Sequence, residues 1–191
     1  MADRLRKRRL NLTRLSMLGL LAAATYAFAR RAEKPLSTVR GVDLQRYQGK
    51  WYEIVRLPLF WEKKCVSDVT ATYTLRQDGK ITVLNACRKA DGSFTNSRGT
   101  AVPATTDGSF SKLKVTFFWP FAGDYWILDL DPEYRWALVG TPDRKHLWVL
   151  SRTPQLSAQT LNVLLNEARD QGFDMSRMIT TAQSKKEELF A

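Results

Sequence analysis

Short runs of apolar, β-branched and aromatic residues alternate with turn-forming residues from residue 51 to residue 152. Inside residues 69–75, Val, Ala, Tyr and Leu share one face while three Thr share the other. A period of two is typical of strands with one buried face. The runs recur at roughly 8–12 residues, which favours an antiparallel barrel or sandwich. They cover residues 51–56, 69–75, 81–86, 93–101, 111–117, 124–129, 136–140 and 145–152.

We therefore predict an all-β fold, an eight-stranded up-and-down antiparallel β-barrel, which is a size that encloses one small ligand. After the runs, apolar residues recur at helical spacing and include Leu164 and Ala168. Ser157 is the expected N-cap, and Gly172 lies just beyond the expected end. We predict that this C-terminal α-helix packs outside the barrel and that residues 173–180 add a short strand.

Residues 1–29 form a leader that is first basic and then apolar. As a helix, its uncharged part is about 22 Å long, short of the ~30 Å hydrocarbon core of a bilayer. This favours a signal peptide, and Ala27-Phe28-Ala29 has the small-x-small pattern of a cleavage site. The alternative is an N-terminal apolar helix that stays uncleaved as a membrane anchor. We expect a linker at residues 30–40, the folded domain at residues 41–183 and a charged tail at residues 184–191.

The two cysteines, Cys65 and Cys87, also bear on the compartment. A hairpin turning at Asp78-Gly79 brings Cys87 opposite the strand that begins near Val69, a few residues from Cys65. We predict a disulfide, which would stabilise the fold by about 3 kcal/mol; two buried thiols are the alternative. The leader and the disulfide together predict an exported protein of the cell envelope, in the periplasm or outer membrane, or anchored in the inner membrane if the leader is uncleaved.

The charge and the motifs exclude several function classes. The net charge is +11, yet outside the leader Lys and Arg are scattered among acids, which argues against nucleic-acid binding. The single histidine, His146, and the cysteine spacing favour neither a metal site nor a haem or other cofactor. No nucleophile, zinc-protease, phosphate-loop or dinucleotide motif is present. We expect no catalytic residues, no cofactor and no metal.

Three separated motifs occur in order along the chain: Gly49-Lys50-Trp51 with residues 51–58, residues 129–140, and Arg152 after the last strand. With Tyr47, they resemble the bacterial, Blc-type branch of the lipocalins, which is related to apolipoprotein D. The resemblance covers about residues 41–183. It implies that the Trp51 indole seals the barrel bottom beneath the Arg152 guanidinium, a contact worth roughly 0.5–2 kcal/mol.

The resemblance also implies a function. Members of this branch look like binders of fatty acids and lysophospholipids that serve envelope maintenance. Many carry a lipid on a cysteine just after the apolar leader, whereas the first cysteine here is Cys65. The resemblance therefore does not extend to a lipid anchor.

If Trp51 and Arg152 both point inward, strand parity predicts an apolar wall that suits an acyl chain. The wall would consist of Val55, Ala71, Tyr73, Val115, Phe117, Tyr125, Ile127, Ala137, Val139, Trp148 and Leu150. Glu53 would also point inward and form a structural ion pair with Arg152. His146 and Arg144 could meet a carboxylate or phosphate head group, although surface roles are preferred for both.

Four loops should rim the open mouth: residues 57–61, 88–92, 118–123 and 141–144. Two of them carry large apolar side chains, which predict contact with a membrane, a greasy ligand or a second subunit in a homodimer. The alternative is that these side chains fold inward and cap the cavity.

The preferred hypothesis is an exported lipid-binding protein that stores or carries a hydrophobic ligand. One alternative is an enzyme with the same barrel acting on a lipid or carotenoid, which would need an unpaired inward carboxylate with a strongly shifted pKa. Glu53 out of contact with Arg152 would favour that alternative. The other is a membrane-tethered interaction module without a ligand, in which side chains would fill the barrel.

Overall fold

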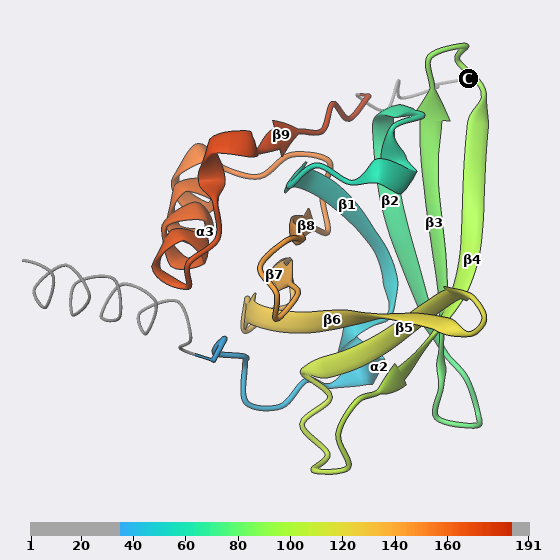
Figure 1. The fold of residues 1–191 in the computed structure, drawn as a ribbon, viewed down its shortest axis with the longest axis vertical. Coiled ribbons are helices and arrows are strands. Elements are labelled where there is room, and N and C mark those ends of the chain that lie inside the picture. The colour runs from blue at the N-terminus through green and yellow to red at the C-terminus, as the bar shows by residue number, and fades with distance from the viewer. Residues whose placement is uncertain (1–34, 185–191) are drawn as a thin grey trace, which may run out of the picture. The chain divides into compact units, whose positions relative to one another are not determined.

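The computed structural model describes residues 35–184, and Figure 1 shows their fold. The expected leader, the N-terminal apolar helix, residues 30–34 of the linker and residues 185–191 of the tail lie outside the described residues. Within them, eight strands form a closed antiparallel barrel, and a short ninth strand lies outside it. The strands are β1 (Gly49–Arg56), β2 (Cys65–Leu75), β3 (Ile81–Lys89), β4 (Phe94–Pro103), β5 (Lys112–Phe118), β6 (Phe121–Leu130), β7 (Trp136–Gly140), β8 (Leu147–Ser151) and β9 (Ile179–Thr180).

The strand order follows the chain, and each strand of the barrel pairs with its sequence neighbours. The barrel closes because β1 pairs with β8 along one edge and with β2 along the other. The predicted all-β, up-and-down barrel is thereby confirmed. Two 3₁₀ turns, η1 (Phe60–Glu62) and η2 (Met175–Arg177), and a short helix α2 (Leu44–Tyr47) complete the elements together with α3 (Ala158–Asp170).

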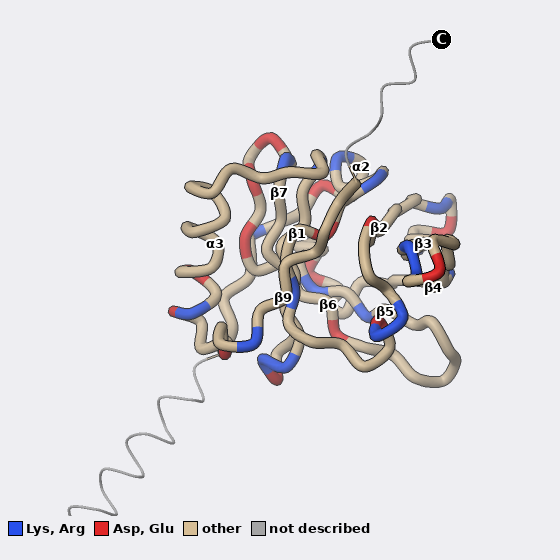
Figure 2. Tube along the Cα trace, turned by 90° about the horizontal axis from the view of Figure 1, so that it is seen from above, with Lys and Arg blue, Asp and Glu red and all other residues tan. Residues whose placement is uncertain are grey.

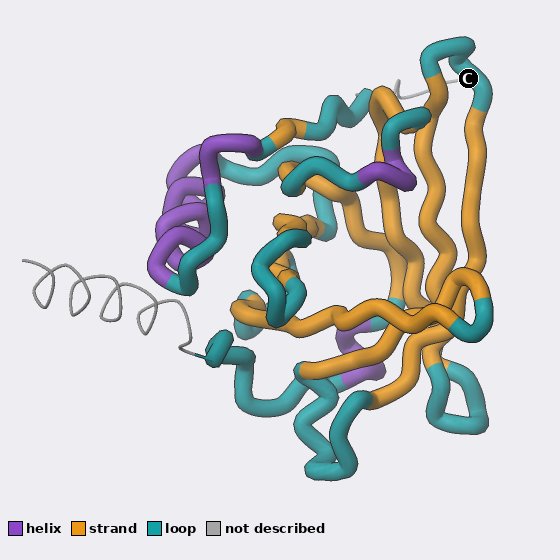
Figure 3. The backbone as a smooth tube through the Cα atoms, in the orientation of Figure 1, coloured by secondary structure: helices purple, strands orange, loops and turns teal. Residues whose placement is uncertain are grey.

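Helix α3 begins and ends where the sequence predicts. The Ser157 side chain accepts a hydrogen bond from the Thr160 N–H, and Gly172 adopts a φ of +89° just after the end. Leu164 and Ala168 are fully buried in an apolar cluster with residues of β6, β7 and β8. Figure 3 shows the helix outside the strands, as predicted. Among the described residues, no helix has the length and apolarity needed to cross a membrane.

Two strands begin at least three residues earlier than the sequence pattern indicates. Strand β2 starts at Cys65 and contains register irregularities before Thr70, which interrupt the alternation there. Strand β6 starts at Phe121, so the expected loop at residues 118–123 is only a tight turn around a cis peptide bond between Trp119 and Pro120. The Ala and Gly that follow Phe121 have low strand propensity, and tertiary pairing with β5 overrides it.

Residues 179–184, here called the C-terminal strap, join β1 to β2 where these two strands have separated. Strand β9 pairs with β1, and the Asp68 N–H donates to the Ala182 carbonyl across 2.8 Å. The Gln183 side-chain amide donates to the carbonyls of both Glu53, on β1, and Val69, on β2, at 2.8 and 2.9 Å. The strap therefore supplies backbone pairing that β1 and β2 do not give each other there.

Candidate ligand-binding site

The bottom of the barrel is sealed by an indole and a guanidinium. Trp51 is fully buried, and its N–H donates to the Tyr47 carbonyl across 2.9 Å. The Arg152 guanidinium carbon lies 3.9 Å from the centre of the Trp51 ring. The same guanidinium donates to the carbonyls of Arg46 and Lys50 at 2.7 and 3.0 Å. These bonds hold the Arg152 guanidinium over the indole and connect the end of β8 to the beginning of β1.

Gly49 makes this arrangement fit. Its φ is +92°, a left-handed conformation that side chains disfavour. A Cβ added there would lie 3.3 Å from an Arg152 guanidinium nitrogen. The glycine of the Gly-x-Trp motif is therefore required both by the backbone turn and by the close approach of Arg152.

An apolar cluster fills the lower part of the barrel interior. Residues of its buried centre include Trp51, Leu113, Ile127, Ala137 and Val139, which are all fully buried. Ten of the eleven side chains predicted for the ligand wall pack in or against this cluster: Ala71, Tyr73, Val115, Phe117, Tyr125, Ile127, Ala137, Val139, Trp148 and Leu150. Their contact with a ligand stays a prediction.

Val55 is the exception and requires a correction. A β-bulge between Glu53 and Val55 shifts the register of β1 against β8, so that Val55 pairs with Val149. Both valines pack in the second apolar cluster, beneath helix α3. Because the bulge inserts one residue, it reverses the parity on which the inward assignment of Val55 depended.

Part of the wall remains accessible to solvent. Ala71, Val115, Phe117, Tyr125 and Trp148 pack against the interior cluster yet are only half-buried, whereas the side chains at the floor are fully buried. Ala71 lies on β2 between two paired neighbours, so its exposed surface faces the interior. The wall side chains are therefore fully buried at the floor and partly exposed above it.

Three tyrosine hydroxyl groups meet just above the floor. The Tyr73 hydroxyl donates to the Tyr125 hydroxyl across 2.9 Å, and the Tyr47 and Tyr125 hydroxyls lie 2.8 Å apart in a second hydrogen bond. Burial raises the pKa of Tyr73 to about 12 and also raises the pKa values of Tyr47 and Tyr125 well above their ordinary value. All three are protonated at neutral pH. Parity had identified Tyr73 and Tyr125, but not Tyr47, which precedes the first strand.

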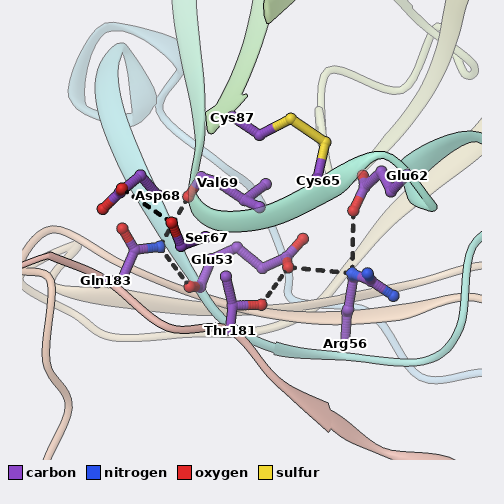
Figure 4. The surroundings of a disulfide bond; sticks show 10 residues. All are labelled: Glu53, Arg56, Glu62, Cys65, Ser67, Asp68, Val69, Cys87, Thr181 and Gln183. Atoms are coloured by element: carbon purple, nitrogen blue, oxygen red, sulfur yellow. Dashed lines mark hydrogen bonds and ion pairs between the residues drawn. A yellow bond between two sulfur atoms is a disulfide. The ribbon is translucent and has the colours of Figure 1, made fainter. Parts of the chain in front are cut away.

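The predicted ion pair between Glu53 and Arg152 is not formed. Glu53 lies at the upper part of β1, where its carboxylate is 3.2 Å from the Arg56 guanidinium and accepts a hydrogen bond from the Thr181 hydroxyl (Figure 4). Arg56 also contacts Glu62 at 3.0 Å. Glu53 pairs with Leu150, whereas the Arg152 guanidinium reaches the Lys50 and Arg46 carbonyls at the floor, so the two side chains have different partners.

Burial dominates the chemistry of this group. It raises the pKa of Glu53 to about 8, with repulsion from Glu62 adding to the effect and Thr181 and Arg56 opposing it. Burial likewise raises the pKa of Glu62. The enzyme hypothesis predicted that Glu53 would not contact Arg152, and this prediction agrees with the structure. That hypothesis also required an unpaired carboxylate, and Glu53 is paired with Arg56.

The predicted disulfide between Cys65 and Cys87 is present and joins β2 to β3 near the strap (Figure 4). Close to it, Asp68 accepts hydrogen bonds from Arg88 at 2.8 Å and from the backbone N–H of Ser184 at 2.6 Å. These bonds lower the pKa of Asp68 to about 2 against the opposing effect of burial. Disulfide and carboxylate thus fasten the strap and two strands at one place.

The connections opposite the floor carry large exposed apolar side chains. Phe118, Trp119 and Phe121 are 76%, 89% and 79% exposed at the β5–β6 turn. Phe60 and Trp61 in η1 are 76% and 46% exposed, and the Trp61 ring lies 5.2 Å from the ring of His146. The first three do not fold inward to cap the interior, which corrects the alternative that the sequence left open. We call these five residues the mouth aromatics.

A pocket of about 500 Å³ lies beside η1 and the strap. Its lining includes Arg56, Lys63, His146 and Arg177. Burial lowers the pKa of His146, which favours its neutral form at pH 7. Arg144 does not reach this pocket: its side chain donates to the Gln171 carbonyl at the end of α3 across 2.7 Å.

Titratable groups elsewhere do not form a metal site. Within residues 35–184, no three His, Cys, Asp or Glu side chains are grouped so that they could hold a metal ion. Lys and Arg are interspersed with Asp and Glu over the described fold, as Figure 2 shows.

Comparison with sequence families is decisive for the identity of the fold. Residues 42–183 match the family described as a lipocalin-like domain. The chain belongs to the lipocalin family. It is 43% identical to outer membrane lipoprotein Blc of Escherichia coli strain K12 over 176 residues, which cover 88% of this chain and 98% of that protein.

Other similar proteins come from a plant and from animals. The chain is 40% identical to temperature-induced lipocalin-1 of Arabidopsis thaliana, covering 80% of this lipocalin and 85% of the plant protein. It is 31% identical to apolipoprotein D of Bos taurus, covering 88% and 92%. Among solved structures, insecticyanin of the tobacco hornworm Manduca sexta superposes with a TM-score of 0.64 at 24% identity, covering 80% and 86%. These proteins share the fold with this lipocalin.

Proposed function

We propose that this lipocalin is an exported carrier that holds the acyl chain of a fatty acid or lysophospholipid in its barrel. The observation that carries the proposal is the gradient along the interior wall. Fully buried apolar side chains form the floor, and half-buried apolar side chains continue above it. Each methylene group that moves from water onto such a wall contributes about 0.8 kcal/mol, so chains of lipid length bind well.

The pocket beside η1 favours a ligand whose polar head group lies at the mouth. Lys63 and Arg177 line this pocket, are exposed, and take part in no ion pair within the described residues. A carboxylate or phosphate would complement their charge while the acyl chain lies in the barrel. We therefore propose a ligand that carries a phosphate or carboxylate head group.

The cell envelope is the proposed location. The bacterial relative is named an outer membrane lipoprotein. Residues 1–29 would direct export or anchor the chain, residues 30–40 would link it to the lipocalin domain, and a disulfide persists in an oxidising compartment. The mouth aromatics would dock on a membrane surface, where the carrier exchanges its ligand; a homodimer through the same residues is the competing use.

A carrier rather than an enzyme fits the interior. The wall residues are apolar or tyrosine. Glu53 on β1 is buried and has a strongly raised pKa, but its side chain is paired with the Arg56 guanidinium. General acid–base chemistry needs a titratable group within reach of the substrate. We therefore propose no catalytic role for Glu53.

Two measurements test the carrier function. Native mass spectrometry of the purified full chain should show a co-purifying acyl lipid, and hexadecanoate should displace a fluorescent fatty acid from it. Val115→Trp, which enlarges a half-buried wall residue, should weaken hexadecanoate binding roughly tenfold by removing space for about two methylene groups. Thr116→Trp, on the opposite face of β5, is the matched control and should bind normally. An empty protein that displaces nothing would contradict the proposal.

A further inference from the structure

The barrel interior holds a buried polar atom that the described part of the protein leaves without a partner. The Asn85 side-chain oxygen is inaccessible to solvent and accepts no hydrogen bond from the described part of the chain. Buried amide oxygens are almost always hydrogen-bonded, because an unpaired one loses its contact with water without replacement. The other two buried atoms in this condition, on Arg56 and Glu62, belong to an ion pair with each other. Asn85 has no such compensation.

Strand register places Asn85 on the inner face of the barrel. Asn85 pairs directly with Ala71, whose side chain packs against the interior cluster. Residues directly opposite each other in an antiparallel pair project to the same face. Ile81 and Val83, on the same face of β3, belong to the buried centre of that cluster. The amide of Asn85 therefore projects into the barrel.

Strand register also places Tyr73 near Asn85 along the barrel wall. Tyr73 pairs with Val83, so Tyr73 and Asn85 are diagonal neighbours on adjacent strands. Such neighbours are about 7–8 Å apart at the backbone. Tyr73 in turn hydrogen-bonds Tyr125 from the facing wall. Asn85 and the tyrosine cluster thus form one polar zone on an otherwise apolar surface.

Hydrogen-bond counting shows a second unmet group in this zone. Three tyrosine hydroxyl groups carry three donor hydrogens, and two hydrogen bonds connect them. One O–H, on Tyr47 or Tyr125, consequently has no acceptor within the described residues. The zone offers one donor and one amide without partners.

We propose that this zone binds a hydroxyl group at the inner end of the ligand, so that the barrel selects hydroxylated over purely hydrocarbon chain ends. The inference rests on the proposed carrier function and specifies its ligand. A hydroxyl group both donates and accepts, so it can satisfy the tyrosine O–H and the Asn85 amide together, in either orientation of that amide. A methyl end satisfies neither, and an ionised carboxylate can only accept.

The test compares matched ligands on the full chain. Dodecanoic, tetradecanoic and hexadecanoic acids are each measured against their ω-hydroxy counterparts by displacement of a fluorescent fatty acid and by calorimetry. A purely apolar pocket penalises the added hydroxyl group, because it must leave water without compensation. The proposal expects the opposite: for the chain length that reaches the floor, the ω-hydroxy acid binds at least as tightly as its parent.

Variants locate the effect. Asn85→Leu should weaken binding of the ω-hydroxy acid roughly tenfold and leave the parent acid unchanged or tighter. Tyr125→Phe, which removes one hydroxyl group with little change of shape, should act in the same direction and serves if Asn85→Leu does not fold. Asn96→Leu, the same substitution at an exposed position on β4, is the control and should change neither ligand.

Three outcomes are distinguishable. Selective loss of ω-hydroxy acid binding in Asn85→Leu or Tyr125→Phe supports the proposal. Binding of every parent acid together with at least tenfold weaker binding of every ω-hydroxy acid to the natural sequence overturns it, while the carrier function stands. Failure of all the acids to bind overturns the carrier function and this inference with it.

Discussion

Glu53, Arg56 and Glu62 place two carboxylates around one guanidinium in the interior of the protein. Glu53 is 3% exposed and Arg56 is 7% exposed. If both carboxylates were ionised, the group would carry an excess negative charge away from water, which is unfavourable. Retention of a proton relieves this excess, and the pKa of Glu53 is accordingly raised to about 8. The protonation state of one side chain therefore depends on how many acids share its partner.

The raised pKa of Glu53 predicts how stability depends on pH. Its ordinary pKa is 4.5, so between 4.5 and about 8 the folded protein holds a proton that the unfolded chain has released. The free energy of unfolding should then fall as pH rises from 5 to 8, by at most about 1.4 kcal/mol per pH unit from this group. Glu53→Gln should remove that slope, as measured by urea unfolding at several pH values.

Asp91→Asn is the control for this experiment. Hydrogen bonds from Ser93 hold the pKa of Asp91 at about 2, so this residue does not titrate between pH 5 and 8. Its substitution should leave the slope unchanged. Equal slopes for Glu53→Gln and the natural sequence would show that Glu53 is ionised in the folded protein throughout this range.

At the scale of elements, the C-terminal strap completes the barrel wall. Strand β1 pairs with β2 only from Gly49 to Tyr52, and the strap occupies the opening above this stretch. Two strands that part at one end expose backbone groups, and a third segment that pairs with both restores their hydrogen bonds. The disulfide between Cys65 and Cys87 lies beside this junction and restricts the unfolded chain as well.

Gln183→Ala should loosen this junction. The substitution removes two hydrogen bonds, to the Glu53 and Val69 carbonyls, and should lower the free energy of unfolding by about 1–2 kcal/mol. Hydrogen exchange measured by mass spectrometry should accelerate in the segments around Ile54 and Asp68, whose backbone groups bond to the strap. Gln155→Ala, at an exposed position, is the control. Unchanged exchange in both segments would show that the strap does not stabilise the opening.

At the scale of the whole molecule, the apolar surface is concentrated at the mouth. The mouth aromatics come from the β5–β6 turn and from η1, which are separate in sequence and lie on connections at the same end of an up-and-down barrel. Lys63 and Lys64 are exposed next to η1. Aromatic side chains with adjacent positive charge suit the interface of a membrane that contains anionic lipid.

Trp119→Ser should therefore weaken binding to vesicles that contain phosphatidylglycerol roughly tenfold, because the substitution removes the apolar area that the indole would bury in the membrane interface. Trp119 is 89% exposed, so the fold should not change. Co-sedimentation with vesicles measures the effect, and Val163→Ser, which alters an apolar residue 59% exposed on α3, is the control. If vesicle binding is unchanged and analytical ultracentrifugation instead shows loss of a dimer, the mouth aromatics form a homodimer interface.

Local pattern by itself predicted the eight strands, the capped helix and the disulfide, and the family resemblance of the sequence implied the floor. Alternation identifies a strand because only one of its faces is buried, and Ser157 identifies the helix start because its side chain satisfies a free N–H. The disulfide between Cys65 and Cys87 was predictable because a single hairpin turn sets which residues of the two strands face each other. The contact between Trp51 and Arg152 was expected from the resemblance to the lipocalins, and the structure contains it.

Only the tertiary structure decided the inward or outward direction of Val55, the partner of Glu53, the role of the strap and the polar zone in the barrel interior. One inserted residue in β1 reverses the direction of Val55, and alternation does not show such a bulge because the consecutive residues Ile54 and Val55 are both apolar. Tyr47, Tyr73 and Tyr125 come from a helix and two distant strands, so their hydrogen bonds exist only once the barrel has closed.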